Sequence, residues 1–241
     1  KMYQWVWLGE SVGVDELIYY MYGNRHRSRP DKDRKYDRIY IGGDYGQQNA
    51  TTFQAFGLDT YQRKFPGLAE YYHSGRDSGY QKSPSEYARD LVEFMDGLHE
   101  QYENRIVYIF LDPSAKGLAE EVRRATRTGL DYQVFLRDAE NDVALGISRV
   151  QKALVFDIMS ISPKQEYAVQ EFGTYEYDKK SIEKGKEVPV KEADHCMDAI
   201  RYVVMGAWSK IKHWLPKDET PEEIDICDIG SREVREEDEY L

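Results

Sequence analysis

Two short apolar runs that each end in an aspartate constrain the fold of this chain most strongly. Residues 39–43 lead into Asp44, and residues 106–111 lead into Asp112. Runs of this length and composition are typical of strands buried in a parallel sheet. Open sheets of this kind place their functional sites at the carboxyl ends of the strands. Both aspartates are therefore candidate site residues, although one acid after one strand is more often a turn former.

The rest of the chain predicts a mixed α/β sheet flanked by helices. Strands are expected over 51–58 and 68–73, so the first three strands form an antiparallel meander. A capping box formed by Ser83 and Glu86, with Pro84 at the first helical position, predicts the start of a helix that reaches Tyr102. Crossover helices then place the later strands parallel to the first. These later elements are helices over 115–128, 143–154 and 163–172, strands over 132–136 and 154–158, and an exposed hairpin over 173–190.

The stretch over 191–202 predicts a two-faced helix that continues to about residue 212. One sector of roughly 120° carries polar groups, and the opposite side is apolar. The polar sector holds Asp194, His195, Asp198, Arg201 and Tyr202. Taken alone, this sector is as well explained by a solvated acidic face. With Asp44 and Asp112 expected at one sheet edge, Asp198 becomes the third carboxylate of a common site.

Three carboxylates of this kind favour a hard divalent cation. Mg²⁺ and Mn²⁺ accept carboxylate oxygens together with waters and substrate phosphates. Two such ions can activate a water and stabilise the leaving oxygen of a phosphodiester. His195 has three interpretations, as general base or water positioner, as metal ligand, or as polar neighbour of Asp198; we favour a role at the metal site. Asp194 is expected to support the site, and Arg201 to act as an ion-pair partner.

The charge distribution permits a nucleic-acid partner despite the net charge of −11. Eleven acidic and three basic residues after Leu215 account for −8, which leaves −3 for residues 1–215. A basic run over residues 24–38 is either a solvated linker or a phosphate-contacting arm. Two cysteines provide no disulfide framework and no zinc cluster, which suits a reducing compartment. No uninterrupted apolar segment is long enough to span a membrane.

Four ordered blocks carry a family resemblance. They are residues 43–46 with 50–52, around Asp44, then 111–115, around Asp112, then 146–151, and finally 194–202, around His195 and Asp198. The set resembles the nuclease domain of tailed-bacteriophage terminase large subunits, in the PBSX-like branch. The resemblance implies a ribonuclease H-like fold and a metal-dependent endonuclease that cuts concatemeric double-stranded DNA during packaging. It implies Asp44, Asp112 and Asp198 as ligands of two Mg²⁺ or Mn²⁺ ions, with His195 close to them.

The resemblance also sets the expected organisation and partners. Residues 1–36 would be a lead-in from a missing amino-terminal ATPase, residues 37–213 the nuclease domain, and residues 214–241 an acidic tail. The sequence of this chain holds no phosphate-binding loop of the kind found in ATPases. Its Gly185-Lys186 pair is preceded by Lys180 where that motif has glycine and followed by Glu187 where it has Ser or Thr. The implied partners are double-stranded DNA, the terminase small subunit and the portal protein. The implied location is the host cell cytoplasm, with no membrane partner and no place in the mature virion.

Two other functions remain open from the residues. The same fold serves junction resolvases and transposases, which would prefer four-way junctions to linear duplex. Alternatively, the chain is a docking module whose acidic tail or aromatic lead-in binds the portal or motor, with weak nuclease activity. The hairpin over 173–190 would lie near the site and limit DNA access.

Overall fold

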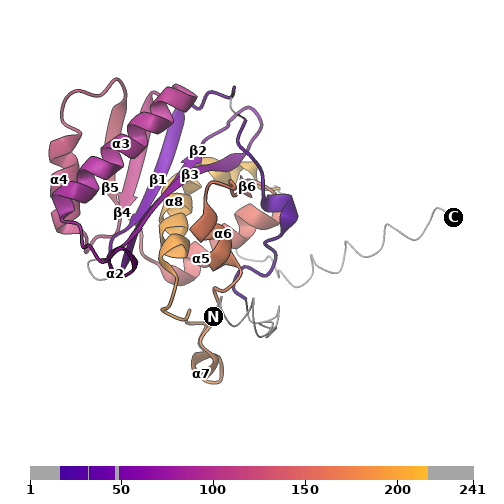
Figure 1. Ribbon diagram of the computed structural model, residues 1–241. Coiled ribbons are helices and arrows are strands. Elements are labelled where there is room, and N and C mark those ends of the chain that lie inside the picture. The colour runs from indigo at the N-terminus through magenta and orange to yellow at the C-terminus, as the bar shows by residue number, and fades with distance from the viewer. Residues whose placement is uncertain (1–16, 32, 47–48, 217–241) are drawn as a thin grey trace.

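One six-stranded sheet forms the centre of the molecule in the computed structural model, which describes residues 17–31, 33–46 and 49–216 (Figure 1). The strand order is β5-β4-β1-β2-β3-β6. The strands are β1 (Arg38–Asp44), β2 (Ala50–Gly57), β3 (Phe65–Ser74), β4 (Ile106–Leu111), β5 (Gln133–Asp138) and β6 (Met159–Ser160).

The strand directions confirm the predicted meander followed by parallel strands. β1 pairs with β2 and β2 with β3 in antiparallel fashion, whereas β4 lies parallel to β1 and β5 parallel to β4. Gly43 of β1 is in register with Leu111 of β4, so the next residues, Asp44 and Asp112, leave the sheet at the same edge. Asp44 also pairs with Thr52, which places the start of β2 and the end of β3 at this edge.

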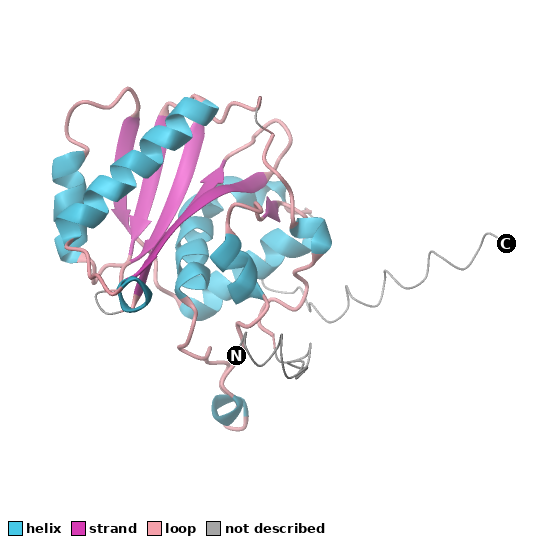
Figure 2. Cartoon of the chain, in the orientation of Figure 1, coloured by secondary structure: helices cyan, strands magenta, loops and turns pink. Residues whose placement is uncertain are grey.

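Helices cover both faces of the sheet (Figure 2). α3 (Pro84–Tyr102) and α4 (Lys116–Ala125) lie on one face, and α5 (Val143–Val155), α6 (Glu166–Phe172) and α8 (His195–Ile211) lie on the other. Side chains of a strand point alternately to the two faces. Ile39 and Ile41 accordingly belong to the core beneath α3 and α4, while Tyr40 belongs to the core beneath α8. The short helices are η2 (Asn24–His26), α2 (Gly75–Ser78), α7 (Lys179–Ile182) and η3 (Lys212–Trp214).

The close approach of α8 to β1 requires a glycine in the strand. A Cβ atom added at Gly42 would lie 2.0 Å from the backbone oxygen of Ala199, far inside contact distance. No larger residue fits there unless the helix moves away. Gly42 therefore lets α8 lie directly on β1, the strand that ends at Asp44.

Two predicted boundaries before α8 are wrong. Residues 154–158 form no strand, because Leu154 continues the buried helical face of Ile147 and Val150, and α5 runs to Val155. The short strand comes later, as β6, and pairs in parallel with β3. The helix predicted over 163–172 begins at Glu166, because residues 162–165 form a turn that the Gln165 side chain closes on the N–H of Ser162.

The approach to α8 also differs from the prediction. The helix begins at His195 rather than Lys191, because Ala193 adopts a left-handed backbone with φ 49°. The predicted hairpin over 173–190 has a paired stem, in which Tyr177 bridges to Pro189. Its tip is the helical turn α7, which projects from the body of the molecule in Figure 1.

The described part of the predicted lead-in packs on the sheet domain. Ile18 and Tyr19 are buried, and the Tyr19 ring lies against Phe172 and Tyr175. The lead-in before residue 17 and the acidic tail after residue 216 lie outside the described residues, and the domain boundaries stay a prediction. None of the helices in the described ranges is long and apolar enough to cross a membrane.

Candidate functional site

Asp44 and His195 form the centre of the candidate site. Asp44 ends β1, His195 begins α8, and the imidazole Nδ1 lies 2.7 Å from Asp44 Oδ2. Burial raises the pKa of the Asp44 carboxyl, and the hydrogen bond from His195 offsets part of that effect. The same hydrogen bond raises the pKa of the His195 imidazole. A positive charge on the His195 imidazole therefore stabilises the ionised Asp44 carboxylate, and the carboxylate in turn favours the protonated ring.

Asp198 lies one turn further along α8 and is held by two cations. Its Oδ1 accepts a hydrogen bond from Arg201 Nη2 at 2.8 Å, and its Oδ2 accepts one from Lys191 Nζ at 3.2 Å. Lys191 Nζ also lies 3.1 Å from Asp194 Oδ2. The ion pair of Arg201 with Asp198 confirms the role predicted for this arginine.

A second glycine makes room for that arginine. Arg201 is 1% exposed, and a Cβ atom at Gly146 of α5 would lie 2.3 Å from Arg201 Cγ. The arginine also contacts Asn141 Oδ1 at 3.3 Å. The glycine of the third sequence block thus allows α5 to pack closely enough to bury the cation that faces Asp198.

Asp112 stands apart from the other two acids. Its Oδ1 accepts the N–H of Ser114 at 2.7 Å, and its Oδ2 accepts the hydroxyl of Tyr202 at 2.8 Å. Burial opposes ionisation, but these hydrogen bonds lower the pKa of the Asp112 carboxyl on balance. Asp112 is therefore an oriented, ionised acid at the same sheet edge, with Tyr202 as its partner on α8.

An open pocket of about 660 Å³ joins most of these groups. Its walls include Asp44, Asp198 and His195, and Asp112 is not among the described residues that line it. Two cations, Arg76 and Lys191, also line the pocket, together with Tyr45, Gly46, Asn49, Glu192, Ala193 and Asp194. The pocket thus offers carboxylate oxygens and positive charge to one ligand.

The donor set fits a hard divalent cation in part. Within residues 17–31, 33–46 and 49–216, no three His, Cys, Asp or Glu side chains converge closely enough to hold an ion. Asp44 and Asp198 share the pocket, and burial raises the pKa of the Asp44 carboxyl, an effect that a bound cation would oppose. Both acids supply the oxygen ligands that Mg²⁺ and Mn²⁺ prefer. Asp112 is hydrogen bonded to Tyr202 and is not among the described residues that line this pocket.

Arg76 and Lys191 are site residues that sequence reasoning did not assign. Arg76 lies in α2, directly after β3, and its only sequence signal is the topology that brings the end of β3 to the edge of Asp44. Arg76 is exposed, and it makes no ion pair with any described residue. Lys191 belongs to the stretch read as a helix, and its contact with Asp198 depends on the break at Ala193.

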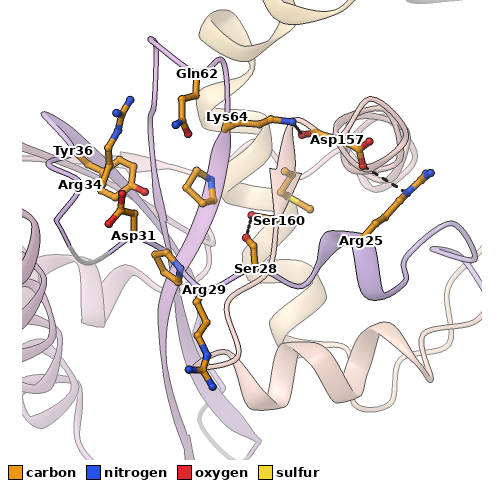
Figure 3. Close-up of a pocket in the computed structure, with 13 residues that line it drawn as sticks. Arg25, Ser28, Arg29, Asp31, Arg34, Tyr36, Gln62, Lys64, Asp157 and Ser160 are labelled. Atoms are coloured by element: carbon orange, nitrogen blue, oxygen red, sulfur yellow. Dashed lines mark hydrogen bonds and ion pairs between the residues drawn. The ribbon is translucent and has the colours of Figure 1, made fainter.

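The basic run over 24–38 lies away from this site. Arg25, Arg29 and Arg34 line a separate pocket of about 330 Å³ with Lys64, beside the start of β3 (Figure 3). β3 has ten residues, so this pocket is roughly 30 Å from the edge of Asp44. Arg34 pairs with Asp59, and Arg25 and Lys64 both point at Asp157 in Figure 3. Internal partners therefore occupy much of the positive charge of this run.

The similarity to known proteins is structural. No family model and no curated protein match the sequence. The large terminase of a thermophilic bacteriophage, in complex with ADP, superposes with a TM-score of 0.68 at 31% identity, over 78% of this chain and 44% of that chain. The P22 large terminase nuclease domain gives 0.60 at 15% identity, over 80% and 92%. The Mn-soaked human cytomegalovirus terminase nuclease domain gives 0.51 at 13% identity, over 75% and 86%.

These matches define the class of the domain. The mixed six-stranded sheet with helices on both faces is a ribonuclease H-like fold. Within that class, the described part of the chain has the fold of a large-terminase nuclease domain, which confirms the resemblance found in the sequence. The chain spans less than half the length of the thermophilic phage protein. Its place in the PBSX-like branch stays a prediction.

Proposed function

We propose that this chain is the metal-dependent endonuclease domain that cuts concatemeric double-stranded DNA during phage genome packaging. The observation that carries the proposal is the meeting of Asp44, Asp198 and His195 in one open pocket at the carboxyl edge of the sheet. The 31% identity to the large terminase of the thermophilic phage supports the packaging context.

Asp44 and Asp198 are the proposed primary metal ligands, and Asp112 is the proposed third. Ser114, Tyr202 and Asn141 each use one position on the Asp112 carboxylate, which has about four lone-pair sites in all. Asp112 therefore keeps acceptor capacity while its orientation is fixed. Two Mg²⁺ or Mn²⁺ ions, when bound, would lower the pKa of the attacking water and stabilise the leaving oxygen. The Mn-soaked cytomegalovirus domain, which shares the fold, is consistent with this choice of ion.

The remaining groups of the pocket bind and orient the DNA. The Nδ1 atom of His195 is hydrogen bonded to Asp44, so Nε2 is the ring nitrogen that can form a hydrogen bond with a water or a phosphate oxygen. Arg76, which also lines the pocket, can neutralise a phosphate of the strand to be cut. Contacts of this kind read the backbone and not the base edges, which suits packaging cuts that need little sequence readout.

The wider context is proposed from the same relationship. The terminase small subunit and the portal protein are the expected protein partners. DNA translocation would be driven by an ATPase domain, located in the part of a large terminase that this chain does not match. The reaction would take place in the host cell cytoplasm.

Asparagine substitutions of the three acids test the proposal. Asp44→Asn, Asp112→Asn and Asp198→Asn each keep the side-chain volume but remove a charged metal ligand. Each should lower Mg²⁺- or Mn²⁺-dependent nicking of supercoiled plasmid at least about 100-fold, since even outer-shell losses cost 10–100-fold in metal sites. Circular dichroism and thermal unfolding should show a folded protein in each case.

The matched control is Glu166→Gln, which removes an exposed carboxylate of α6 outside the pocket. It should cut at the wild-type rate. Undiminished nicking by all three aspartate variants would contradict the assignment. A preference of the wild type for four-way junctions over linear duplex would instead support a resolvase.

A further inference from the structure

Glu171 is a buried carboxyl group that reaches across to the start of α8. It lies near the end of α6 and is 6% exposed. Its Oε2 accepts the backbone N–H of Cys196 at 2.7 Å and the backbone N–H of Met197 at 3.1 Å. One oxygen atom of α6 therefore binds two consecutive amides of the helix that carries the candidate site.

The first turn of α8 needs such an acceptor. The first N–H groups of any helix have no partner within the helix. The N-cap residue, Asp194, makes no side-chain capping bond, because its carboxylate faces Lys191. Glu171 is thus the described side chain that caps the amides at the second and third positions of α8.

We propose that Glu171 is a positioning residue for the nuclease site, because it caps α8 from outside and so fixes the helical turn that presents His195 and Asp198. The inference rests on the proposed function. The two capped residues, Cys196 and Met197, lie directly between His195 and Asp198 in the chain. Any shift of their amides therefore moves both site residues relative to Asp44.

The cap is itself anchored to the sheet. Glu70 of β3 accepts the N–H groups of Tyr167 and Ala168, at 2.7 and 3.1 Å, and so caps the start of α6. Gln54 of β2 donates to the same carboxyl at 2.9 Å. Two carboxyl groups in series thus connect the sheet to α6 and α6 to α8. Because β1 of the same sheet carries Asp44, the series fixes the two sides of the site in one frame.

Acceptor geometry, more than charge, makes the cap. Burial raises the pKa of Glu171 to about 8, so the group is largely neutral at pH 7. The side-chain amide of glutamine has the same length and retains an acceptor oxygen. Glutamine should therefore reproduce the cap, whereas alanine removes it and aspartate keeps the carboxyl group on a side chain one methylene too short.

Variants at this position separate the possibilities. Glu171→Ala and Glu171→Asp should lower kcat for plasmid nicking about tenfold or more, with KM for DNA nearly unchanged. Loss of a hydrogen bond that supports a metal ligand typically has an effect of about this size. Glu171→Gln should restore kcat to the wild-type value. Glu166→Gln removes a carboxylate from the same helix without touching α8 and should behave as wild type. If Glu171→Ala does not fold, the contrast between the Asp and Gln variants decides.

Amide hydrogen exchange provides the readout that is independent of catalysis. Without metal or DNA, the amides of Cys196 and Met197 should exchange faster in Glu171→Asp than in wild type, while those of Val203 and Val204 in the middle of α8 stay protected. Unchanged exchange at Cys196 and Met197, or a Gln variant as slow in cutting as the Asp variant, overturns the positioning role. A wild-type chain that cuts no DNA overturns the proposed function and this role with it, whatever the exchange pattern.

Discussion

Arg76 lines the same pocket as the carboxylates of Asp44 and Asp198. Lys191 is paired with Asp194 and Asp198, and Arg201 with Asp198, whereas Arg76 makes no ion pair with a described residue. An exposed arginine at the mouth of an acidic pocket can bind a phosphate at little cost in desolvation. Because it lines the same pocket as His195, it suits a contact with the phosphate backbone of bound DNA.

Arg76→Ala should therefore weaken DNA binding and leave the carboxylate chemistry intact. We expect a higher Kd for duplex DNA of any sequence and a salt dependence with a slope smaller by about one, since one phosphate contact is lost. Fluorescence anisotropy over a range of salt concentrations measures both. Arg127→Ala, which removes an exposed arginine beyond α4, is the matched control. An unchanged salt slope in Arg76→Ala would remove this residue from the binding surface.

Single residues were predictable from the sequence where a local pattern marks them. Asp44 and Asp112 each follow an apolar strand, so their position at one edge of the sheet could be expected. Asp198 lies in the polar sector of an amphipathic helix, which marked it as a third candidate. The hydrogen bond between Tyr202 and Asp112 could not be expected, because it depends on how far α8 lies from β4. Glu171 gave no signal either, since its partners are backbone amides 25 and 26 residues away.

The segment between α6 and α8 places its own cation, Lys191, beside Asp198, one of the proposed metal ligands. Lys191 Nζ bridges Asp194 and Asp198 at 3.1 and 3.2 Å. An ammonium group there satisfies carboxylates that would otherwise repel one another. A divalent ion that binds Asp198 Oδ2 would have to displace the Lys191 ammonium group. The segment that carries Lys191 would therefore move when the ion binds.

Lys191→Met should increase the affinity of the DNA-free protein for Mn²⁺, because methionine keeps the bulk of the side chain and removes the competing charge. A gain of about tenfold would correspond to ~1.4 kcal/mol. Isothermal titration with Mn²⁺ measures it directly. Lys186→Met alters an exposed lysine of the same segment and should bind as wild type. Weaker Mn²⁺ binding by Lys191→Met would show that the lysine supports the site and does not compete for it.

Whole elements were predicted well where periodicity and capping agree. The capping box of Ser83 and Glu86 begins α3 as expected. The start of α8 was misplaced because Ala193 takes a left-handed conformation that nothing in its side chain favours. The start of α6 differs from the prediction because the Gln165 side chain closes a turn on the N–H of Ser162, and Glu70 of β3 caps the helix that follows. Neither boundary follows from the spacing of apolar residues in the sequence.

At the scale of the molecule, the order of the strands followed from connection rules, and the assembly of the site did not. A meander followed by crossover helices fixes which strands are parallel and which edge carries the acids. It does not fix the separation of α8 from β4, which leaves Asp112 bonded to Tyr202 while Asp44 and Asp198 share a pocket. Bound metal and DNA are the forces that would draw the three acids together.

Crystals of the chain soaked in Mn²⁺ would show whether the carboxylates of this pocket bind a metal ion. We expect anomalous density in the pocket between Asp44 and Asp198, at ligand distances of about 2.1 Å from their oxygens, with Lys191 withdrawn and Asp112 turned toward the ion. A pocket without density, in which Lys191 still holds Asp198 at Mn²⁺ concentrations that support cleavage, would contradict this expectation.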